Sequence, residues 1–479
     1  MSKLTKISKN KIKNNGQIYT PDFIVNNILD IVGYDGNSIL EKDIIDNSCG
    51  NGAFLIGIVK RYCGAFYKKY GKSDNEKLKS HLEKYIHGVE VQSEEIGGCV
   101  ANLNNEVKNF GLLNVKWDLI CADALSVDSY NGKMDFVVGN PPYVRVHNLN
   151  ESYNKVKEFK FCKKGMIDLY IVFFEISLKM LNKSGKMCLI TPSSFLRSNA
   201  GAELRKYIFE NKNLTKVIDL EHFQPFNATT YTMITLFEMG KKCNQIEYYI
   251  YDEDKKEPKK IESLNYSDIF IDGKIYFSKN ENLKFLREVE VYNTNNKADF
   301  DVKNGFATLA DSVFINKLNF ENKTIPVLKA STGKWYSCFF PYDEAGEPIN
   351  FDEIKQNSQL YNYLLDNKAM LEERSLEKNS SWFLFGRSQG IKDVFKNKIA
   401  INTIIKDVDS IRIEEVPSGS GIYSGLYVLS NMSFNKVKES VKNSDFINYI
   451  KLLKNYKSGG YYTFSSGELK NFLNYKIKR

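Results

Sequence analysis

Short apolar stretches alternate with helical patterns over the first half of the chain, and no other feature restricts the possible folds as strongly. The stretches expected to form strands are residues 44–45, 85–89, 119–121, 134–138, 186–190, 217–220 and 232–237. Amphipathic helical patterns occur near residues 22–31, 53–61, 95–108 and 168–181. Strands that are apolar on both faces need helices on both sides, as in a parallel sheet. We therefore expect an α/β, doubly wound, Rossmann-like domain over residues 16–245.

The pattern changes after about residue 240. The charged run 252–260 predicts a solvated turn or linker. Beyond about residue 290 the alternation is lost in a segment rich in Tyr, Phe, Asn and Ser. We expect four parts: a basic N-terminal arm at 1–15, the doubly wound domain at 16–245, a connecting segment at 246–290 and a mixed α+β domain at 291–479.

Composition excludes several classes of protein. The chain has no run of eighteen apolar residues, so no membrane span is expected, and its Lys-rich start lacks the apolar core of a secretory signal. The eight cysteines form no CxxC pair and only four histidines are present, so neither a zinc site nor a disulfide framework is favoured. We expect a reduced, cytoplasmic protein without a bound metal. The net charge of +9 is shared by both halves and leaves the partner open.

Acidic residues follow the first three predicted strands. Asp46 opens a glycine-containing turn before a helix whose N-terminal N–H groups can bind an anion. Glu90 follows the second strand, where a carboxylate can accept from both hydroxyls of a ribose, and Asp123 follows the third, where it can accept from an adenine amino group. Taken singly, these residues also fit a structural turn, a solvated strand end and a helix N-cap. Because the carboxyl ends of parallel strands meet at one edge, the three together predict a nucleotide-like ligand there.

The tetrapeptide Asn140-Pro141-Pro142-Tyr143 follows the fourth predicted strand, at the same edge. Alone, Asn-Pro-Pro is a turn. In this place its chemistry is coherent, because the lone pair of an aryl amine is delocalised into the ring and is a poor nucleophile. The Asn140 side-chain oxygen and the Pro141 carbonyl can each accept one N–H of such an amine, which localises the lone pair for in-line attack. Tyr143 offers its ring face to a base.

In this order the motifs resemble those of the gamma class of DNA adenine amino-methyltransferases, the group of the Taq-type restriction–modification enzymes. Residues 16–21 resemble its N-terminal cofactor motif, residues 46–54 its motif I, and residues 168–170 its motif V. The resemblance implies that S-adenosylmethionine is bound by Tyr19, Thr20, Asp46, Cys49, Gly50, Gly52, Glu90, Asp123 and Asn140. It implies that the catalytic residues are Asn140, Pro141 and Tyr143. It implies that the flipped base is bound by Pro142, Tyr143 and Phe226, and Phe223 is an alternative to Phe226 as the aromatic residue that packs on this base. Thr20 is also expected to cap the following helix, with Pro21 at its first position.

The sequence departs from the family pattern at two positions. Asn47 replaces the usual proline of motif I, which is expected to loosen that turn slightly. Ala124 stands where some relatives have an aromatic ring against the cofactor adenine. The resemblance further implies that the C-terminal domain reads DNA. Arg387 and Gln389 are candidates for guanine and adenine edges, although phosphate contact or local packing is the commoner role of such residues.

The sequence thus predicts a site-specific adenine-N6 methyltransferase that flips its target base out of duplex DNA and modifies DNA in a restriction–modification system. A separate cognate endonuclease would be a further partner. Two alternatives stay open. An RNA or protein-glutamine amino-methyltransferase is disfavoured by the long region beyond residue 290, and a non-catalytic DNA-specificity subunit is disfavoured by the intact cofactor motifs.

Overall fold

The computed structural model describes residues 19–145, 153–226, 230–316, 320, 323–378 and 380–478. The expected basic arm at 1–15 and the start of the N-terminal cofactor motif, residues 16–18, lie outside the described residues. The chain divides into two compact units, residues 1–284 and residues 285–479.

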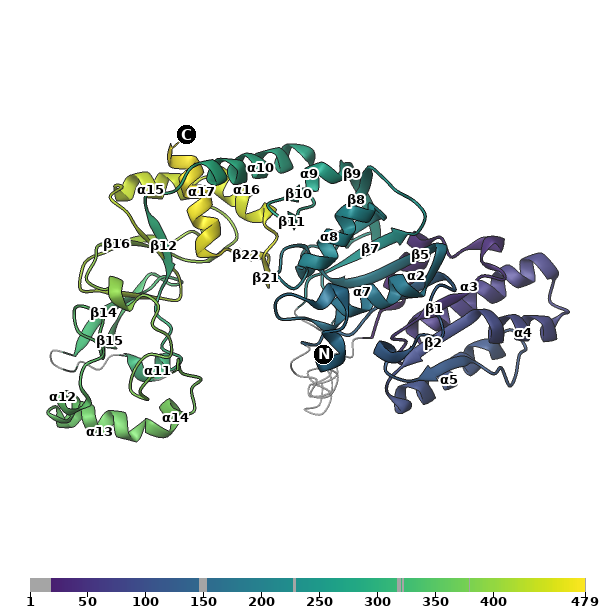
Figure 1. Ribbon diagram of the computed structural model, residues 1–479, viewed down its shortest axis with the longest axis horizontal. Coiled ribbons are helices and arrows are strands. Elements are labelled where there is room, and N and C mark those ends of the chain that lie inside the picture. Colours follow the sequence, from purple (N-terminus) through teal and green to yellow (C-terminus); the bar gives the residue numbers. More distant parts are fainter. Residues whose placement is uncertain are drawn as a thin grey trace. The chain divides into compact units, whose positions relative to one another are not determined.

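The first unit is built on a nine-stranded sheet with the strand order β3-β2-β1-β4-β5-β7-β6-β8-β9 (Figure 1). Its strands are β1 (Ile44–Asp46), β2 (Ile86–Glu90), β3 (Asp118–Cys121), β4 (Met134–Gly139), β5 (Leu181–Pro192), β6 (Leu214–Asp219), β7 (Thr232–Glu238), β8 (Gln245–Asp252) and β9 (Glu257–Asn265). The strands from β3 to β5 run parallel, whereas β7 is antiparallel to both β5 and β6. The expected doubly wound sheet is thus confirmed. Its strand order reverses between β1 and β4, which is where such sheets bind ligands.

Helices cover both faces of this sheet. The larger ones are α2 (Asp22–Val32), α3 (Ala53–Tyr70), α4 (Asn75–Tyr85), α5 (Ser93–Lys108), α7 (Leu169–Met180) and α8 (Ala202–Asn211). The connections between parallel strands are right-handed, and they run in opposite directions on the two sides of the point between β1 and β4 where the strand order reverses. Their helices therefore lie on opposite faces of the sheet, with α3 and α5 on one face and α7 on the other. α2 packs against α3, and α7 against β4 and β5. α7 is predominantly apolar and almost entirely buried, which fixes the chain that follows β4.

Three local expectations need correction. Pro21 is the N-cap of α2, and Thr20 makes no cap, because its side chain is instead bonded to Asn140. α3 continues to Tyr70, well beyond residue 61, because its buried stripe continues through residues 62–66. Residues 246–290 do not form a simple connection: β8 pairs with β6 and β9 with β8, so both extend the sheet. The charged residues that suggested a linker lie in the turn between β8 and β9 and on β9 itself. Because β9 is the outermost strand of the sheet, solvent reaches its unpaired edge.

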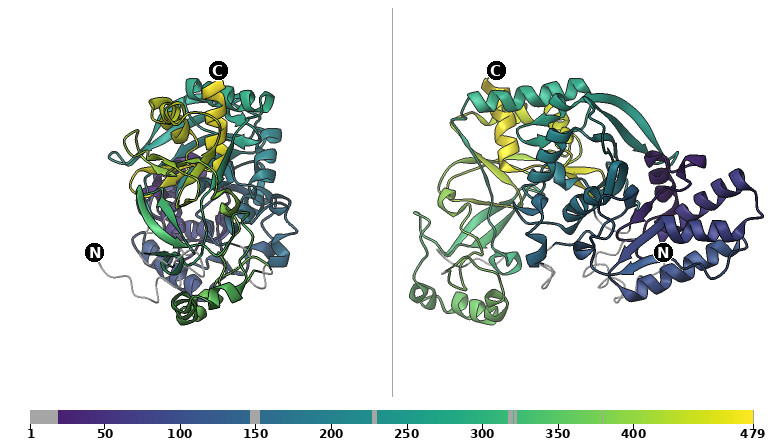
Figure 2. Two further views of the ribbon diagram at one scale, coloured as in Figure 1. Left: turned by 90° about the vertical axis from the view of Figure 1, so that its left-hand side faces the viewer. Right: turned by 45° about the vertical axis from the view of Figure 1, so that its right-hand side comes forward.

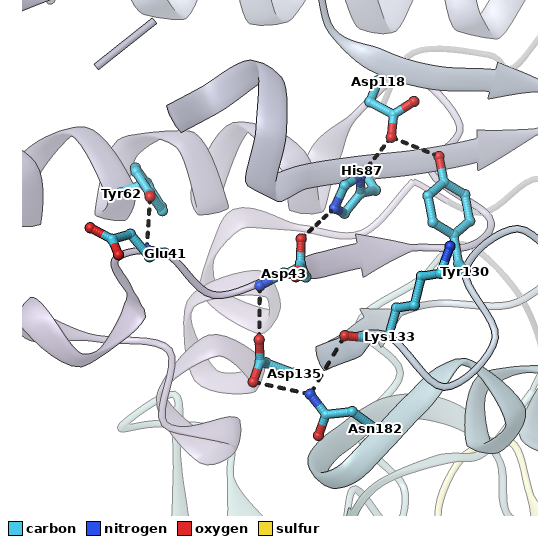
Figure 3. A network of polar contacts seen from close by, with 9 residues as sticks. All are labelled: Glu41, Asp43, Tyr62, His87, Asp118, Tyr130, Lys133, Asp135 and Asn182. Carbon is cyan, nitrogen blue, oxygen red and sulfur yellow. Dashed lines mark hydrogen bonds and ion pairs between the residues drawn. The ribbon is translucent and has the colours of Figure 1, made fainter. Parts of the chain in front are cut away.

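The edge where the strands begin is tied by a polar network (Figure 3). His87 at the start of β2 lies between two carboxylates, with Nδ1 2.6 Å from Asp118 Oδ2 and Nε2 3.1 Å from Asp43 Oδ1. Burial alone would lower the pKa of His87, but the hydrogen bonds to Asp118 and Asp43 outweigh it and raise the pKa above its ordinary value. Asp135 accepts from the Asp43 backbone N–H at 3.0 Å and joins β4 to this network. The network holds the strand starts together, away from the edge that carries the predicted site.

The second unit contains three small sheets among its described residues, with the strand orders β12-β20-β16-β18, β13-β15-β14-β19 and β17-β22-β21. Figure 2 shows the ribbon of this unit, in green to yellow, from two further sides. The strands are β12 (Asp301–Asn304), β13 (Ile315–Asn316), β14 (Thr324–Lys329), β15 (Lys334–Phe339), β16 (Lys398–Ile401), β17 (Ile404–Ile405), β18 (Ile413–Val416), β19 (Gly421–Tyr423), β20 (Leu426–Leu429), β21 (Tyr456–Lys457) and β22 (Tyr461–Thr463). The helices are α11 (Asp311–Phe314), α12 (Phe351–Lys355), α13 (Ser358–Asp366), α14 (Lys368–Glu372), α15 (Phe434–Val441), α16 (Ser444–Leu452) and α17 (Ser466–Lys478).

The core of this unit contains an aromatic cluster, in which Phe306, Phe314, Phe339, Phe340 and Phe385 contact one another ring to ring. The mixed α+β architecture expected beyond residue 290 is confirmed. The remaining α-helices and strands are α6 (Tyr153–Val156), α9 (Tyr266–Ile269), the two-residue strands β10 (Phe270–Ile271) and β11 (Lys274–Ile275), and α10 (Asn280–Asn295), which contains the boundary between the units.

None of the helices in the described part of the chain combines the length and hydropathy that a membrane span requires. Within the same described ranges, no group of three or more His, Cys, Asp or Glu side chains is placed to hold a metal ion.

Candidate active site

The turn after β1 is built around a buried carboxylate. Asp46 is 2% exposed, and its Oδ1 accepts from the Ser48 backbone N–H at 3.0 Å. Burial raises the pKa of Asp46 to about 7, against the lowering effect of the Ser48 N–H, and the charge of Glu90 adds to the rise. Asp46 is therefore only partly ionised near neutral pH, and a cation bound beside it would favour the carboxylate form.

Two glycines bring the backbone of this turn close to its surroundings. Gly50 and Gly52 have φ angles of +50° and +92°, in the region that favours glycine. A Cβ at Gly52 would lie 2.7 Å from Cys99 Sγ on α5, so only glycine fits there without movement. A hydrogen bond with Cys99, together with burial, raises the pKa of the Cys49 thiol, which marks it as a packing residue and not a nucleophile. The turn ends where α3 begins and presents the free N–H groups of that helix.

Glu90 and Asp123 stand at the ends of the next two strands. Glu90 accepts from the Gly50 N–H at 3.1 Å and from the Gln92 N–H at 3.0 Å. Asp123 accepts from the Leu125 N–H at 3.0 Å and begins a short 3-10 helix, so the N-cap role considered from sequence is real. Each carboxylate oxygen accepts more than one hydrogen bond, so both residues keep capacity for a ligand.

One cavity of about 350 Å³ brings most of the predicted residues together. Its lining includes Tyr19, Thr20, Asp46, Cys49, Gly50, Glu90, Asp123, Asn140 and Pro142. Gly52, Pro141, Tyr143 and Phe226 do not line it. The volume is within the usual range for small-ligand sites, and apolar and polar groups both face it.

Sequence reasoning missed several residues of this cavity. Gln92 and Glu95 line it from the start of α5, and Tyr19 OH donates to Glu95 Oε1 at 3.4 Å. Phe173 lines it from α7, as does Leu169, which belongs to the segment that resembles motif V. A polar residue in the first turn after a predicted strand end is a weak signal that could have pointed to Glu95. Phe173 could not have been distinguished from a core position.

Asn140 is held in one orientation by two hydrogen bonds. Its Nδ2 donates to Thr20 Oγ1 at 3.1 Å, and its Oδ1 accepts from Tyr143 OH at 2.5 Å. Tyr143 OH also lies 3.1 Å from the Ile190 carbonyl oxygen on β5. The amide group thus has its nitrogen toward the N-terminal segment and its oxygen beside the aromatic ring. An amide oxygen has two lone pairs, so Oδ1 can still accept one further N–H.

Aromatic rings surround the tetrapeptide. The Tyr143 ring meets Tyr170 and Phe226 edge to face, at centroid distances of 6.4 and 6.5 Å. Phe223 instead stacks on Tyr251 of β8, with 5.2 Å between ring centroids and an interplanar angle of 5°. The structure therefore brings Phe226, and not its competitor Phe223, to the tetrapeptide. Asn227, the next residue, lies outside the described residues.

The two departures from the family pattern are both buried. Asn47 is 1% exposed, and its Nδ2 donates to Ser177 Oγ on α7 at 2.8 Å, so this side chain ties the turn to the helix. Ala124 is 8% exposed and lines the cavity beside Leu125.

Arg387 and Gln389 lie in the second unit and bond locally. Arg387 donates to the Ser375 and Gly386 carbonyls, at 2.5 and 2.7 Å. Gln389 Nε2 donates to the Gly305 carbonyl at 2.6 Å. Gln389 also lines a groove of about 270 Å³ together with Asn304 and Ser331. In this state both side chains pack against their own unit.

The comparisons with known proteins agree with this geometry. Residues 45–226, which include the turn after β1, Glu90, Asp123 and the tetrapeptide, match the family model of the Eco57I restriction-modification methylase. Over these residues the chain is similar to that family. The match confirms the resemblance seen in the sequence at the level of a restriction–modification methylase, and this family implies S-adenosylmethionine as cofactor.

Curated relatives extend the similarity beyond the methylase region. The chain is 26% identical to the type II methyltransferase M.BstVI of Geobacillus stearothermophilus over 79% of its own length and 75% of that protein. It is 25% identical to the type II restriction enzyme and methyltransferase RM.Eco57I of Escherichia coli, over 87% of its length but only 52% of that protein.

Solved structures share the fold over nearly the whole chain. The type IIL restriction-modification enzyme MmeI, determined in complex with DNA, superposes with a TM-score of 0.64 at 14% identity and covers 97% of this chain and 65% of its own. The type ISP enzyme LlaGI, a nuclease-deletion mutant with a DNA substrate mimic, gives a TM-score of 0.59 at 12% identity and covers 95% and 46%. This chain therefore spans less than two thirds of several of the proteins it matches.

Proposed function

We propose that the protein transfers the methyl group of S-adenosylmethionine to the exocyclic N6 amine of an adenine in duplex DNA at a specific sequence. The observation that carries this proposal is the placement of Asn140. Its amide oxygen is fixed beside a cavity that has acidic residues at the ends of three neighbouring strands. A hydrogen-bond acceptor in this position suits an aryl amine that must be made nucleophilic.

The cavity fits the cofactor that the family implies. Glu90 would accept from the ribose hydroxyls and Asp123 from the adenine amine, as their strand ends are neighbours in the sheet. Asp46, with Tyr19 and Thr20, would face the methionine end, where a positive charge stabilises the Asp46 carboxylate. The bound sulfonium supplies an electrophilic methyl group.

The protein's own groups would activate the amine. Asn140 Oδ1 and the Pro141 carbonyl would accept its two N–H bonds, and Tyr143 would stack on the base. The hydrogen bond from Tyr143 OH keeps Oδ1 directed away from the Thr20 side of the amide. Because the Tyr143 and Phe226 rings now meet edge to face, Phe226 would turn as the flipped base enters. Positioning would supply most of the acceleration.

The choice of DNA rests on the relatives and on the second unit. The curated relatives are restriction–modification methyltransferases, and MmeI and LlaGI were determined with DNA or a DNA mimic. Their fold similarity extends over the second unit, which we propose reads the DNA sequence.

A methyl-transfer assay tests this function. The purified protein is incubated with S-adenosylmethionine labelled in the methyl group and, separately, with duplex DNA, RNA and a protein extract. The products are then digested to nucleosides and amino acids. We expect label in N6-methyladenine from DNA. Label in N4-methylcytosine, RNA or glutamine would assign another substrate, and cofactor binding without transfer to any of them would favour a non-catalytic subunit.

A further inference from the structure

A ten-residue stretch between β4 and α7 is unusually basic. Residues 155–164 contain five lysines and one glutamate, a net charge of +4 in ten residues, whereas the whole 479-residue chain carries +9. All five lysines are exposed. We call residues 155–164 the lysine segment; its lysines are Lys155, Lys157, Lys160, Lys163 and Lys164.

Buried side chains fix this segment to the first unit. Val156, Phe161 and Cys162 are buried between the lysines, at 0%, 6% and 3% exposure. The Phe161 backbone N–H donates to the buried Glu175 carboxylate on α7 at 2.9 Å. The lysines are therefore exposed on an anchored backbone, and little backbone conformational entropy remains to be lost when they bind a partner.

The chain beyond the segment is equally constrained. Gly165 has a φ of +68°, and a Cβ there would lie 2.8 Å from the Ala200 backbone nitrogen. The Leu169 N–H donates to the Val144 carbonyl at 2.8 Å, and both of these residues line the candidate cofactor cavity. The hydrogen bond between Val144 and Leu169 thus joins the two ends of the loop that carries the lysine segment, and both ends lie at the cavity. The first of these ends, Val144, directly follows the tetrapeptide.

The charges of the segment are only partly neutralised within the protein. Lys164 pairs with Glu203 at 3.1 Å. Lys155 instead donates to the Ser126 hydroxyl at 3.0 Å, and Lys163 to the backbone carbonyl of Lys157. The carboxylates nearest in the chain are Glu158, within the segment, and Glu151 and Asp168, each four positions from one of its ends.

We propose that Lys155, Lys160 and Lys163 contact the phosphates of duplex DNA beside the target adenine. The inference rests on the proposed function and adds to it a surface of the first unit that holds the duplex. Lysine is a point charge that suits phosphate without reading sequence, so these contacts position the DNA and carry no specificity.

The salt dependence of DNA binding tests this surface. Each lysine–phosphate contact releases counterions and steepens the plot of log affinity against log salt by about 0.9. A triple variant Lys155→Gln, Lys160→Gln, Lys163→Gln is compared with the wild type on a fluorescein-labelled duplex by anisotropy over a salt series. We expect its slope to be shallower by roughly 2.7, with weaker binding at low salt for any duplex sequence.

Two matched variants separate charge from structure. In Lys155→Arg, Lys160→Arg, Lys163→Arg the charges remain, and we expect the wild-type slope. In Lys68→Gln, Lys69→Gln, Lys72→Gln the same charge is removed at and just beyond the far end of the 18-residue α3, which lies about 27 Å from its start at the candidate site, and we also expect the wild-type slope. Cofactor affinity, measured by calorimetry, should be equal in all four proteins.

The proposal would be overturned if the glutamine variant of the lysine segment had the wild-type slope. It would also be overturned if the arginine variant bound the duplex as weakly as the glutamine variant, or if the α3 variant lost as much slope as the segment variant. These outcomes are distinct from a failure of the proposed function. If the wild type methylates adenine in DNA while the slope is unchanged, only the lysine segment is wrongly assigned. If it methylates no DNA, the function itself fails.

Discussion

The single residue whose surroundings explain most is Asn140. The two ends of an amide side chain are nearly the same in shape, and only the bonds they make decide which end faces a ligand. Here Thr20 accepts from the nitrogen and Tyr143 donates to the oxygen, so both ends are determined. The sequence predicted an acceptor role for the Asn140 oxygen. It could not predict the bond to Thr20, because that bond joins residues 120 positions apart and depends on how α2 packs.

Replacing Tyr143 by phenylalanine tests this orientation. Tyr143→Phe keeps the ring and removes the hydrogen bond to Asn140 Oδ1. A bond of this kind contributes about 0.5–1.5 kcal/mol, so we expect kcat to fall roughly two- to tenfold while the KM for DNA changes little. The matched control is Tyr170→Phe in the neighbouring ring. It also removes a hydroxyl, which here is hydrogen-bonded to Ser194 Oγ at 2.8 Å and not to Asn140. An equal fall in kcat in both variants would argue against a specific role for the Tyr143 hydroxyl.

The raised pKa of Asp46 predicts a pH dependence of cofactor binding. Because burial raises the pKa of Asp46 to about 7, the acid form predominates below that pH and cannot pair with a cationic ligand. Affinity for S-adenosylmethionine should therefore rise as pH increases through 7 and level off above it. Calorimetry across this range measures the effect, and Asp46→Asn should bind more weakly with a flatter profile. If the wild type and Asp46→Asn had the same dependence of affinity on pH, Asp46 would not contribute to cofactor binding.

At the scale of elements, strands with both faces buried were predictable, and strands with a polar edge were not. β1 is buried at all three positions, and β2 and β4 are largely buried. Such apolar runs are visible in the sequence. β9 exposes charged residues, as an outermost strand does, and its composition cannot be told from that of a linker without knowing that β8 pairs beside it.

Replacing glycine by alanine is expected to change the stability of the protein in opposite directions at two positions, one in the turn before α3 and one within α3. Gly52→Ala would place a Cβ 2.7 Å from Cys99 Sγ at a φ of +92°, so we expect a loss of stability of more than about 1 kcal/mol and weaker cofactor binding. Apart from its chain neighbours and the backbone of its own helix, no described atom lies within 4 Å of a Cβ at Gly64 in α3, so Gly64→Ala should gain about 0.5–1 kcal/mol. Urea denaturation measures both changes, and equal effects would contradict this account of the turn.

The network at the strand starts predicts a pH-dependent contribution to stability. The folded-state pKa of His87 lies above 6.5, so its stabilising effect is complete below pH 6.5 and is lost as pH rises through the folded-state pKa. The difference in Tm between the wild type and His87→Gln should therefore shrink as the pH increases from 5.5 to 8. Burial lowers the pKa of His81, so His81→Gln should show the opposite trend. A His87 difference that grows with pH would contradict the assignment.

At the scale of the whole molecule, the sequence predicted two architectures but little of the second. The loss of strand–helix alternation beyond residue 290 is matched by short strands whose partners are distant, such as β12 with β20 and β14 with β19. Strands of two to six residues carry too little periodicity to be recognised, and distant pairing leaves no local signal. The methylase region was predictable because its chemistry follows each strand in turn.

Single-molecule modification mapping of DNA from cells that express the protein tests the central claim most directly. The wild type and Asn140→Ala are compared in a host without adenine methylation of its own, and cofactor binding by the purified variant is checked by calorimetry. We predict N6-methyladenine at one recurring sequence with the wild type, and none with Asn140→Ala, which should still bind S-adenosylmethionine. Methylated adenine in cells expressing Asn140→Ala, or modification of cytosine alone by the wild type, would contradict the account.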